Sequence, residues 1–268
     1  MTTGAKPKSS VVIKSVALPA EHGGWGFLIE PIILGMLVAG SWQGALLALS
    51  AFGVFLIHQP LKVATKDRLK GRRPARTIWA ERFVGGYGLL AIVPMLILMA
   101  TTPITFLIPI ALAIPFASIQ LYYDARNQSR NLIPEVCGAL ALAMVAPSIA
   151  ILGGWETGTA LILWTVLCLR AITAILYIRT RLKAERDQIA PVNLVWGLHV
   201  LALVIITGMS ISDITPLLTI VAFGLLLLRA YLGLSRYRKA RPVKVIGFQE
   251  LGYGILTVVI IALGYALG

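Results

Sequence analysis

Acidic residues are scarce in this sequence, and so are charged residues in general. The 268 residues include 11 Asp and Glu against 24 Lys and Arg, and charged residues of both signs make up only 13% of the chain. Hydrophobic residues make up 58%, and the mean hydropathy is +0.85. No polar stretch between the apolar runs is long enough to bury a core of its own, which excludes a separate soluble domain.

Cysteine is also rare. Cys137 and Cys168 are the only two cysteines, and both fall within apolar runs. Two cysteines in such positions exclude a disulfide framework. We expect each thiol to pack as a small hydrophobic side chain.

Long apolar runs recur along most of the chain. Each is close to the roughly 20 residues that an α-helix needs to cross a hydrocarbon core of ~30 Å. A backbone in lipid must satisfy its own hydrogen bonds, so each run is expected to be a helix. We therefore predict an all-α, polytopic membrane protein with about nine transmembrane helices, at residues 24–40, 43–61, 83–101, 103–122, 132–152, 159–178, 191–209, 214–233 and 248–267.

The basic residues lie on one side of this predicted path. The loops after spans two, four, six and eight contain Lys and Arg, whereas the opposite loops contain neither. This pattern is the positive-inside signature, which places the N-terminus in the cytoplasm. We predict a basic cytoplasmic tail at residues 1–20 and a single transmembrane domain at 21–268. The net charge of +13 then reflects topology and attraction to anionic headgroups, and no nucleic-acid partner is expected.

Several ionisable residues lie within the predicted spans, where they are costly and usually functional or paired. On the predicted topology all of them fall in the cytoplasmic half of the bilayer, which indicates a polar cavity open to the cytoplasm and closed on the far side. A channel through the membrane would need polar residues in the outer half as well. The alternative is that the arginines extend to the interface and pair with the glutamates as contacts between helices. These residues are Glu30, His58, Glu135, Arg170, His199, Arg229 and Glu250.

Two stripes of residues with four-residue spacing follow the second and sixth spans. One is His58, Lys62 and Lys66; the other is Arg179, Lys183 and Asp187. This spacing places each trio on one face of a helix, provided that the helix continues past Pro60. Several cations on one face suit a phosphate or a carboxylate. The alternative is that these are solvated helix ends.

Two further polar segments lie at the same predicted membrane face. Glu21 and His22 precede the first span, and a carboxylate beside an imidazole can hold a proton near neutral pH. Tyr123 and Asp124 follow span four. These two residues either line the mouth of a cavity or belong to the interfacial belt.

Three stretches of the sequence resemble the YwiC-like family of bacterial membrane proteins. They are PAEHGGWGFLIEPIILG (Pro19 to Gly35), HQPLKVATKDRLKGRRPAR after span two and YIRTRLKAERDQ after span six. The resemblance covers essentially the whole chain. It implies a multi-pass protein of the bacterial cytoplasmic (inner) membrane but no particular activity.

The nine spans and the polar loops after spans two and six also resemble, more distantly, the UbiA superfamily of intramembrane prenyltransferases. That resemblance implies a UbiA-like helical bundle. In the superfamily these loops carry Asp-rich motifs whose carboxylates hold Mg²⁺ against a diphosphate, because this cation requires oxygen ligands. Here the matching places hold the two stripes, in which bases mostly replace the acids. The resemblance therefore does not extend to the magnesium site, and we predict no metal and no cofactor.

We consider three functions. The first is binding of an anionic amphiphile, an isoprenoid or a lipid with or without a phosphate, to a cytoplasm-facing cationic cavity. Within this function, metal-independent group transfer with Glu21 or His22 as the base stays open. The second is a small-molecule or proton-coupled transporter, and the third is a non-catalytic accessory subunit whose protein partner the sequence does not name. The expected ligand-binding residues are His58, Lys62, Lys66, Arg179, Lys183, Arg170, Arg229, Glu30, Tyr123 and Asp124.

Overall fold

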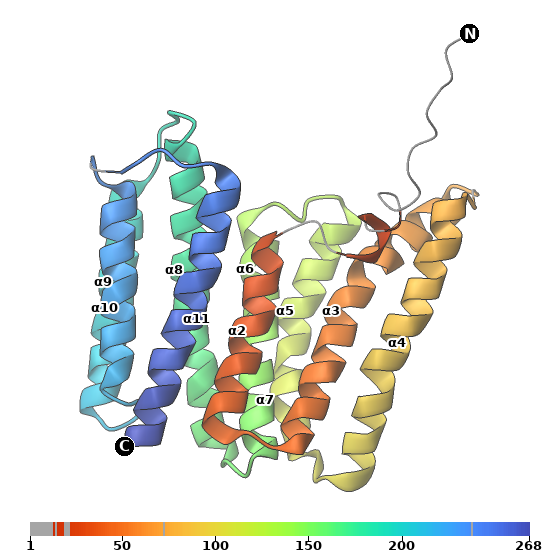
Figure 1. The fold of residues 1–268 in the computed structure, drawn as a ribbon, viewed down its shortest axis with the longest axis horizontal. Helices are drawn as coiled ribbons and strands as arrows, with labels where there is room; N and C mark the ends of the chain where they lie inside the picture. Colours follow the sequence, from red (N-terminus) through yellow and green to blue (C-terminus); the bar gives the residue numbers. More distant parts are fainter. Residues whose placement is uncertain (1–12, 14, 19–21, 72, 237) are drawn as a thin grey trace. The chain divides into compact units, whose positions relative to one another are not determined.

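A computed structural model describes residues 13, 15–18, 22–71, 73–236 and 238–268 (Figure 1). The described residues include no β-strand, and the structure is 83% helical, which confirms the all-α prediction. The chain divides into two compact units, Met1–Gly24 with Leu46–Thr102, and Trp25–Ala45 with Pro103–Gly268. Each unit is described by itself. The single transmembrane domain over residues 21–268 stays a prediction.

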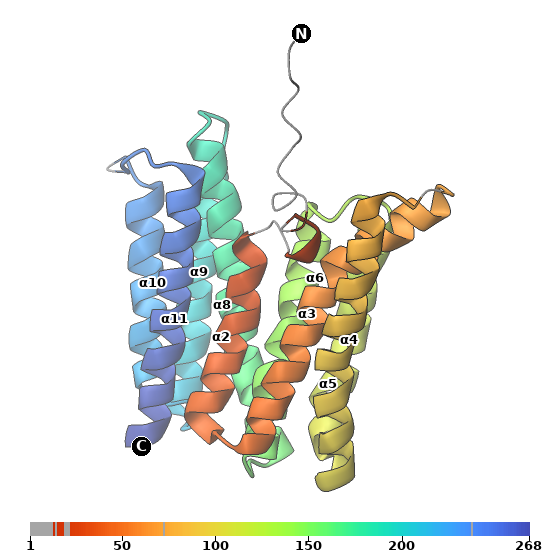
Figure 2. The ribbon, with the colours of Figure 1, turned by 45° about the vertical axis from the view of Figure 1, so that its right-hand side comes forward.

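The first unit is built on a helical hairpin (Figure 2). Its helices are α3 (Trp42–Leu69), which enters this unit at Leu46, and α4 (Ala75–Thr101). The Ser50 hydroxyl donates a hydrogen bond of 2.7 Å to the carbonyl oxygen of Ala91. Gly53 faces the backbone of the same alanine. A small residue at this crossing allows the two backbones to approach closely, as is common between helices in membranes.

The second unit contains most of the chain. Its elements are α2 (His22–Ala39, in this unit from Trp25), the 3₁₀ turn η1 (Ile104–Phe106), α5 (Leu107–Ala125), α6 (Leu132–Ala143), α7 (Val145–Leu152), α8 (Thr157–Ala184), α9 (Val192–Ile211), α10 (Leu218–Leu234) and α11 (Val243–Leu267). Helix α8 is central, because it packs against α6, α7, α9, α10 and α11.

A proline divides the fifth predicted span into two helices. Helix α6 ends at Ala143 and α7 begins at Val145, with Met144 between them. Pro147 lacks the amide N–H that would bond to the carbonyl of Ala143 in a continuous helix. The sequence predicted one span at 132–152; the structure contains the same residues as two consecutive helices.

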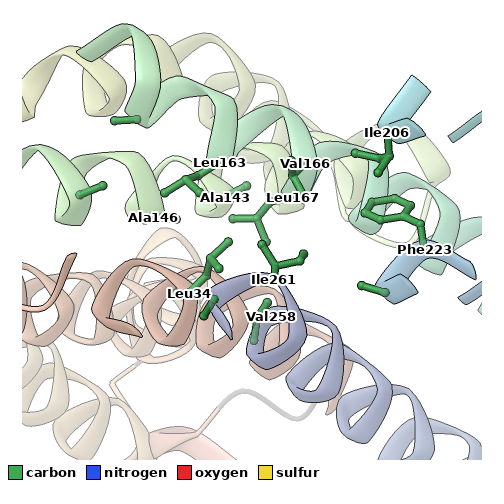
Figure 3. Packing of buried hydrophobic residues seen from close by; sticks show 14 of the residues in the cluster. Leu34, Ala143, Ala146, Leu163, Val166, Leu167, Ile206, Phe223, Val258 and Ile261 are labelled. Atoms are coloured by element: carbon green, nitrogen blue, oxygen red, sulfur yellow. The ribbon is translucent and has the colours of Figure 1, made fainter. Parts of the chain in front are cut away.

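The core of the second unit is apolar and built from small and branched side chains (Figure 3). Leu34 of α2, Leu163 and Leu167 of α8, and Val258 and Ile261 of α11 are all buried within it. Gly35 on α2 lies so close to α7 that a Cβ atom there would be 2.9 Å from Cβ of Ile149. Close approach of this kind gains van der Waals contact, which is a main source of helix association in membranes.

Among the described residues, seven helical segments are long and apolar enough to cross a membrane: Trp42–Leu69, Ala75–Thr101, Ile104–Ala125, Leu132–Leu152, Thr157–Ala184, Val192–Ile211 and Val243–Leu267. The apolar helices Gly24–Ala39 and Leu218–Leu234 are shorter. The protein is therefore a multi-pass membrane protein. All nine predicted spans coincide with helical segments, but the count of nine crossings and the sidedness of the termini stay predictions.

Candidate functional site

The centre of the second unit contains a network of ionisable side chains from five helices. Arg170, on α8, has a side chain that is only 1% exposed. Its Nη2 donates to Oε1 of Glu30 on α2 at 3.1 Å, and its Nη1 lies 3.2 Å from Oε1 of Glu250 on α11. Nη2 is also 3.5 Å from the backbone carbonyl oxygen of Glu250. One arginine therefore joins two glutamates that are far apart in the sequence.

A second buried arginine continues the network. Arg229, on α10, pairs through Nη1 with Oε2 of Glu250. Its Nη2 lies 3.3 Å from Nε2 of His199 on α9, and Nδ1 of the same imidazole lies 2.8 Å from the carbonyl oxygen of Val195. A carbonyl only accepts hydrogen bonds, and an arginine only donates them. Both contacts are thus satisfied by a neutral imidazole with its proton on Nδ1.

Two tyrosine rings surround the guanidinium group of Arg229. Its Cζ lies 4.0 Å from the ring centroid of Tyr177 and 5.7 Å from that of Tyr253. Cation–π contacts in a desolvated place contribute about 2 kcal/mol or more. The rings thus stabilise the charge where water is excluded.

Glycine on α11 makes room for the carboxylate of Glu30. A Cβ atom at Gly254 would overlap Oε1 of Glu30 and would lie 2.9 Å from Nη2 of Arg170. On α2 itself, a Cβ at Gly26 would lie 3.5 Å from the same carboxylate oxygen. The ion pair between α2 and α8 therefore depends on a residue without a side chain on a third helix.

The network is balanced in charge but not in hydrogen bonds. Two guanidinium groups face two carboxylates. Nε and Nη1 of Arg170, Nε of Arg229 and Oε1 of Glu250 are buried and have no hydrogen-bond partner among the described residues. Burying ions costs several kcal/mol each, and ionisable groups within membrane helices are functional-site candidates by default. The arrangement offers spare donors to an additional oxyanion.

Comparison with known proteins identifies the family of the first half of the chain. Residues 18–150 match the family model described as YwiC-like protein. Over these residues the chain is similar to YwiC-like proteins. The match confirms the predicted family resemblance and includes Glu30, whereas Arg170, Arg229 and Glu250 lie beyond it. No curated protein and no solved structure matches the chain, and the distant resemblance to the UbiA superfamily stays a prediction.

Three of the predicted ligand residues meet in the network: Glu30, Arg170 and Arg229. Glu250 and His199 belong to it as well. The sequence marked these two as ionisable residues within spans but gave no reason to choose them as ligand residues. Tyr253 was not predicted at all, because a tyrosine near the end of a span is also typical of the interfacial belt.

The stripe on α8 is only partly as predicted. Arg179 pairs with Glu135 of α6 at 2.6 Å, with both side chains more than a third exposed, and Lys183 is exposed. Helix α8 ends at Ala184, and Asp187 has a positive φ of 53° beyond that end. The prediction that Asp187 shares a helical face with Arg179 and Lys183 was therefore wrong, because the chain leaves the helix before it.

The stripe of His58, Lys62 and Lys66 lies on α3 in the first unit. Helix α3 continues through Pro60 to Leu69, so the four-residue spacing does place the three residues on one helical face. Lys66 is exposed, and His58 and Lys62 are partly buried.

Tyr123 and Asp124 are in the last turn of α5. Tyr123 helps to line a shallow hollow of about 480 Å³, whose other residues are Ser118, Ile119, Tyr122 and Ile133. Asp124 is buried. Glu21 lies outside the described residues, and so does the side chain of His22, although α2 begins at His22.

Proposed function

We propose that this YwiC-like membrane protein binds an anionic amphiphile, an isoprenoid or a lipid, from the cytoplasmic side of a bacterial inner membrane. Arg170 and Arg229 are the partners of its headgroup. The observation that carries the proposal is a pair of guanidinium groups, buried between apolar helices, that together keep three N–H donor positions unused. Arginine is suited to this role because its charge is permanent and its planar donors match oxyanions.

An amphiphile fits this setting better than a small soluble anion. The outer surfaces of α9 and α10 carry exposed apolar side chains, among them Leu201, Val204 and Leu228. Such surfaces meet lipid chains in a membrane. A ligand with an apolar tail can therefore keep the tail in lipid while the headgroup reaches the arginines between the helices.

The test is ligand-dependent thermal stability of the detergent-purified protein. The panel contains isoprenyl diphosphates, quinones and anionic phospholipids, each measured with Mg²⁺ and with EDTA. A ligand that binds only the native state raises the melting temperature by mass action. We expect a rise with anionic amphiphiles that survives EDTA and disappears in the charge-balanced variant Arg229→Gln/Glu250→Gln.

The matched control is Arg76→Gln/Asp67→Asn, which removes one guanidinium–carboxylate pair from the first unit. It should leave the ligand-induced rise intact. No rise with any anionic amphiphile, or an equal rise in the Arg229→Gln/Glu250→Gln protein, would reject the proposal.

A transporter is the competing function, and the charge-balanced network favours it, because chains of ionisable residues within membranes often relay protons or bind substrates. Proteoliposomes with an imposed pH gradient separate the two functions. Solute flux that depends on the gradient and on Glu30 would favour transport. Ligand binding without flux would favour an amphiphile-binding protein.

Group transfer stays a prediction within this proposal. Its base candidates, Glu21 and His22, precede the network on the chain. A transferase assay becomes informative once the panel has identified a bound diphosphate.

A further inference from the structure

Glu250 is shared by both arginines of the network. Its Oε1 lies 3.2 Å from Nη1 of Arg170, and its Oε2 pairs with Nη1 of Arg229. Glu30, by contrast, forms an ion pair with Arg170 alone among the residues that the structure describes. Glu250 is thus the carboxylate that bridges guanidinium groups from two different helices, α8 and α10.

This bridge is incompletely hydrogen-bonded. Oε1 of Glu250 and Nη1 of Arg170 form an ion pair by distance, yet neither atom has a hydrogen-bond partner among the described residues. Nε of each arginine is also unused. A carboxylate has two oxygens, whereas a phosphate group offers three or more acceptors to the same donors.

Glu250 is also the accessible member of the network. Its side chain is 15% exposed, compared with 1% for Arg170, 4% for Arg229 and 6% for Glu30. It lies two turns into α11, which begins at Val243.

We infer that Glu250 occupies the binding place of the ligand's own acid group and competes with it, so that the ligand bears a phosphate-type oxyanion that bridges Arg170 and Arg229. This inference rests on the proposed function and specifies its ligand class. When Glu250 withdraws, two guanidinium groups remain beside the single carboxylate of Glu30. The net positive charge then attracts an oxyanion that uses the free N–H groups.

The experiment measures the affinity of purified protein for two probes that share this chemistry. Inorganic pyrophosphate represents a free phosphate, and phosphatidic acid in detergent micelles represents a lipid headgroup. The key variant is Glu250→Gln, which keeps the shape of the side chain and removes the competing charge. We expect Kd for at least one probe to fall on the order of tenfold, equivalent to about 1.4 kcal/mol.

Glu30→Gln is the matched control, because it removes the same charge from the same network but leaves the Glu250 carboxylate between Arg170 and Arg229. It should change Kd much less than Glu250→Gln. If wild type binds a probe and Glu250→Gln binds it no better, or if Glu30→Gln gives an equal gain, the inference is overturned. If Glu250→Gln does not fold, Glu250→Asp takes its place, because it keeps the charge on a shorter side chain. Its Kd should then be lower than that of wild type.

Failure of the proposed function gives a different result. In that case neither probe binds wild type or Glu250→Gln, or binding persists in Arg229→Gln/Glu250→Gln. If Glu250→Gln gains affinity for phosphatidic acid alone, the site between Arg170 and Arg229 binds a lipid headgroup. If it gains affinity equally for pyrophosphate, the site recognises the phosphate group itself.

Discussion

The two units use the same ions in opposite surroundings. In the first unit Asp67 accepts hydrogen bonds from Arg76 and from the hydroxyl of Thr77, and Arg68 and Arg73 share Glu81. The arginine side chains of these pairs are 55–66% exposed. In the second unit the arginine side chains of the network are 1–4% exposed.

This difference decides what each set of ions contributes. Exposed pairs are screened by water and salt, and they contribute little to stability. They join the end of α3 to the start of α4 without a large energetic consequence. A buried pair costs free energy to form, but loss of one partner costs more, because an uncompensated charge remains. Four substitutions test this contrast, and we expect their effects to decrease in the order Arg170→Ala, Gly254→Ala, Tyr177→Leu and Asp67→Asn.

Arg170→Ala should have the largest effect. It leaves Glu30 and Glu250 with one arginine between them, and loss of one partner of a buried ion pair destabilises by about 3–5 kcal/mol. Unfolding in mixed micelles measures the loss. Arg170→Gln/Glu30→Gln keeps the charge balance and should recover part of the lost stability. If Arg170→Ala is as stable as this double variant, an uncompensated buried charge is not the cause of the loss.

Gly254→Ala should come next. The added Cβ would overlap the carboxylate of Glu30, and overpacking of a well-packed place typically costs roughly 1–3 kcal/mol. Gly252→Ala, two residues earlier on α11, is the control, because a Cβ there meets no heavy atom of the described residues within 4 Å. Equal melting temperatures for the two variants would show that α11 does not limit the position of Glu30.

Tyr177→Leu should have a smaller effect. It removes the ring that lies 4.0 Å from the guanidinium of Arg229, and a desolvated cation–π contact contributes about 2 kcal/mol, which is less than the upper end of the range for overpacking. Tyr177→Phe keeps the ring and should be close to wild type in the same unfolding measurement. Equal losses in both variants would assign the effect to the hydroxyl instead.

Asp67→Asn, in the first unit, should have the smallest effect. It removes the charge that Arg76 faces. The Asp67 side chain is only 5% exposed, but the arginine is 55% exposed, so water and salt screen the pair. The shift in melting temperature should be smaller than that of the Gly254→Ala protein and should shrink further as salt is added. A large shift that is independent of salt would show that the ion pairs of the two units are equivalent, and the contrast would fail.

Much of the fold follows from local sequence. Hydropathy located the apolar segments. It did not predict how far helices extend past the apolar runs: α3 continues to Leu69 and α4 begins at Ala75, both within the predicted loop. Hydropathy is insensitive to polar helical turns, such as those that contain Asp67 and Arg76.

The candidate site was less predictable. The sequence identified Glu30, Arg170 and Arg229 as costly residues within spans, yet it could not distinguish an open cationic cavity from a set of paired ions. The stripe on α8 shows the limit of spacing arguments. Arg179 and Lys183 share a helical face, but the helix ends before Asp187, and spacing alone does not say where a helix ends.

Composition and hydropathy alone established that this chain is a helical, multi-pass membrane protein, because the length and hydropathy of a span are properties of consecutive residues. Only the tertiary structure decided which charges meet. Glu30 and Arg170 are 140 residues apart, and Arg170 and Glu250 are 80 residues apart. Their contact depends on the packing of α2, α8 and α11, including the room that Gly254 leaves, and no local pattern encodes that packing.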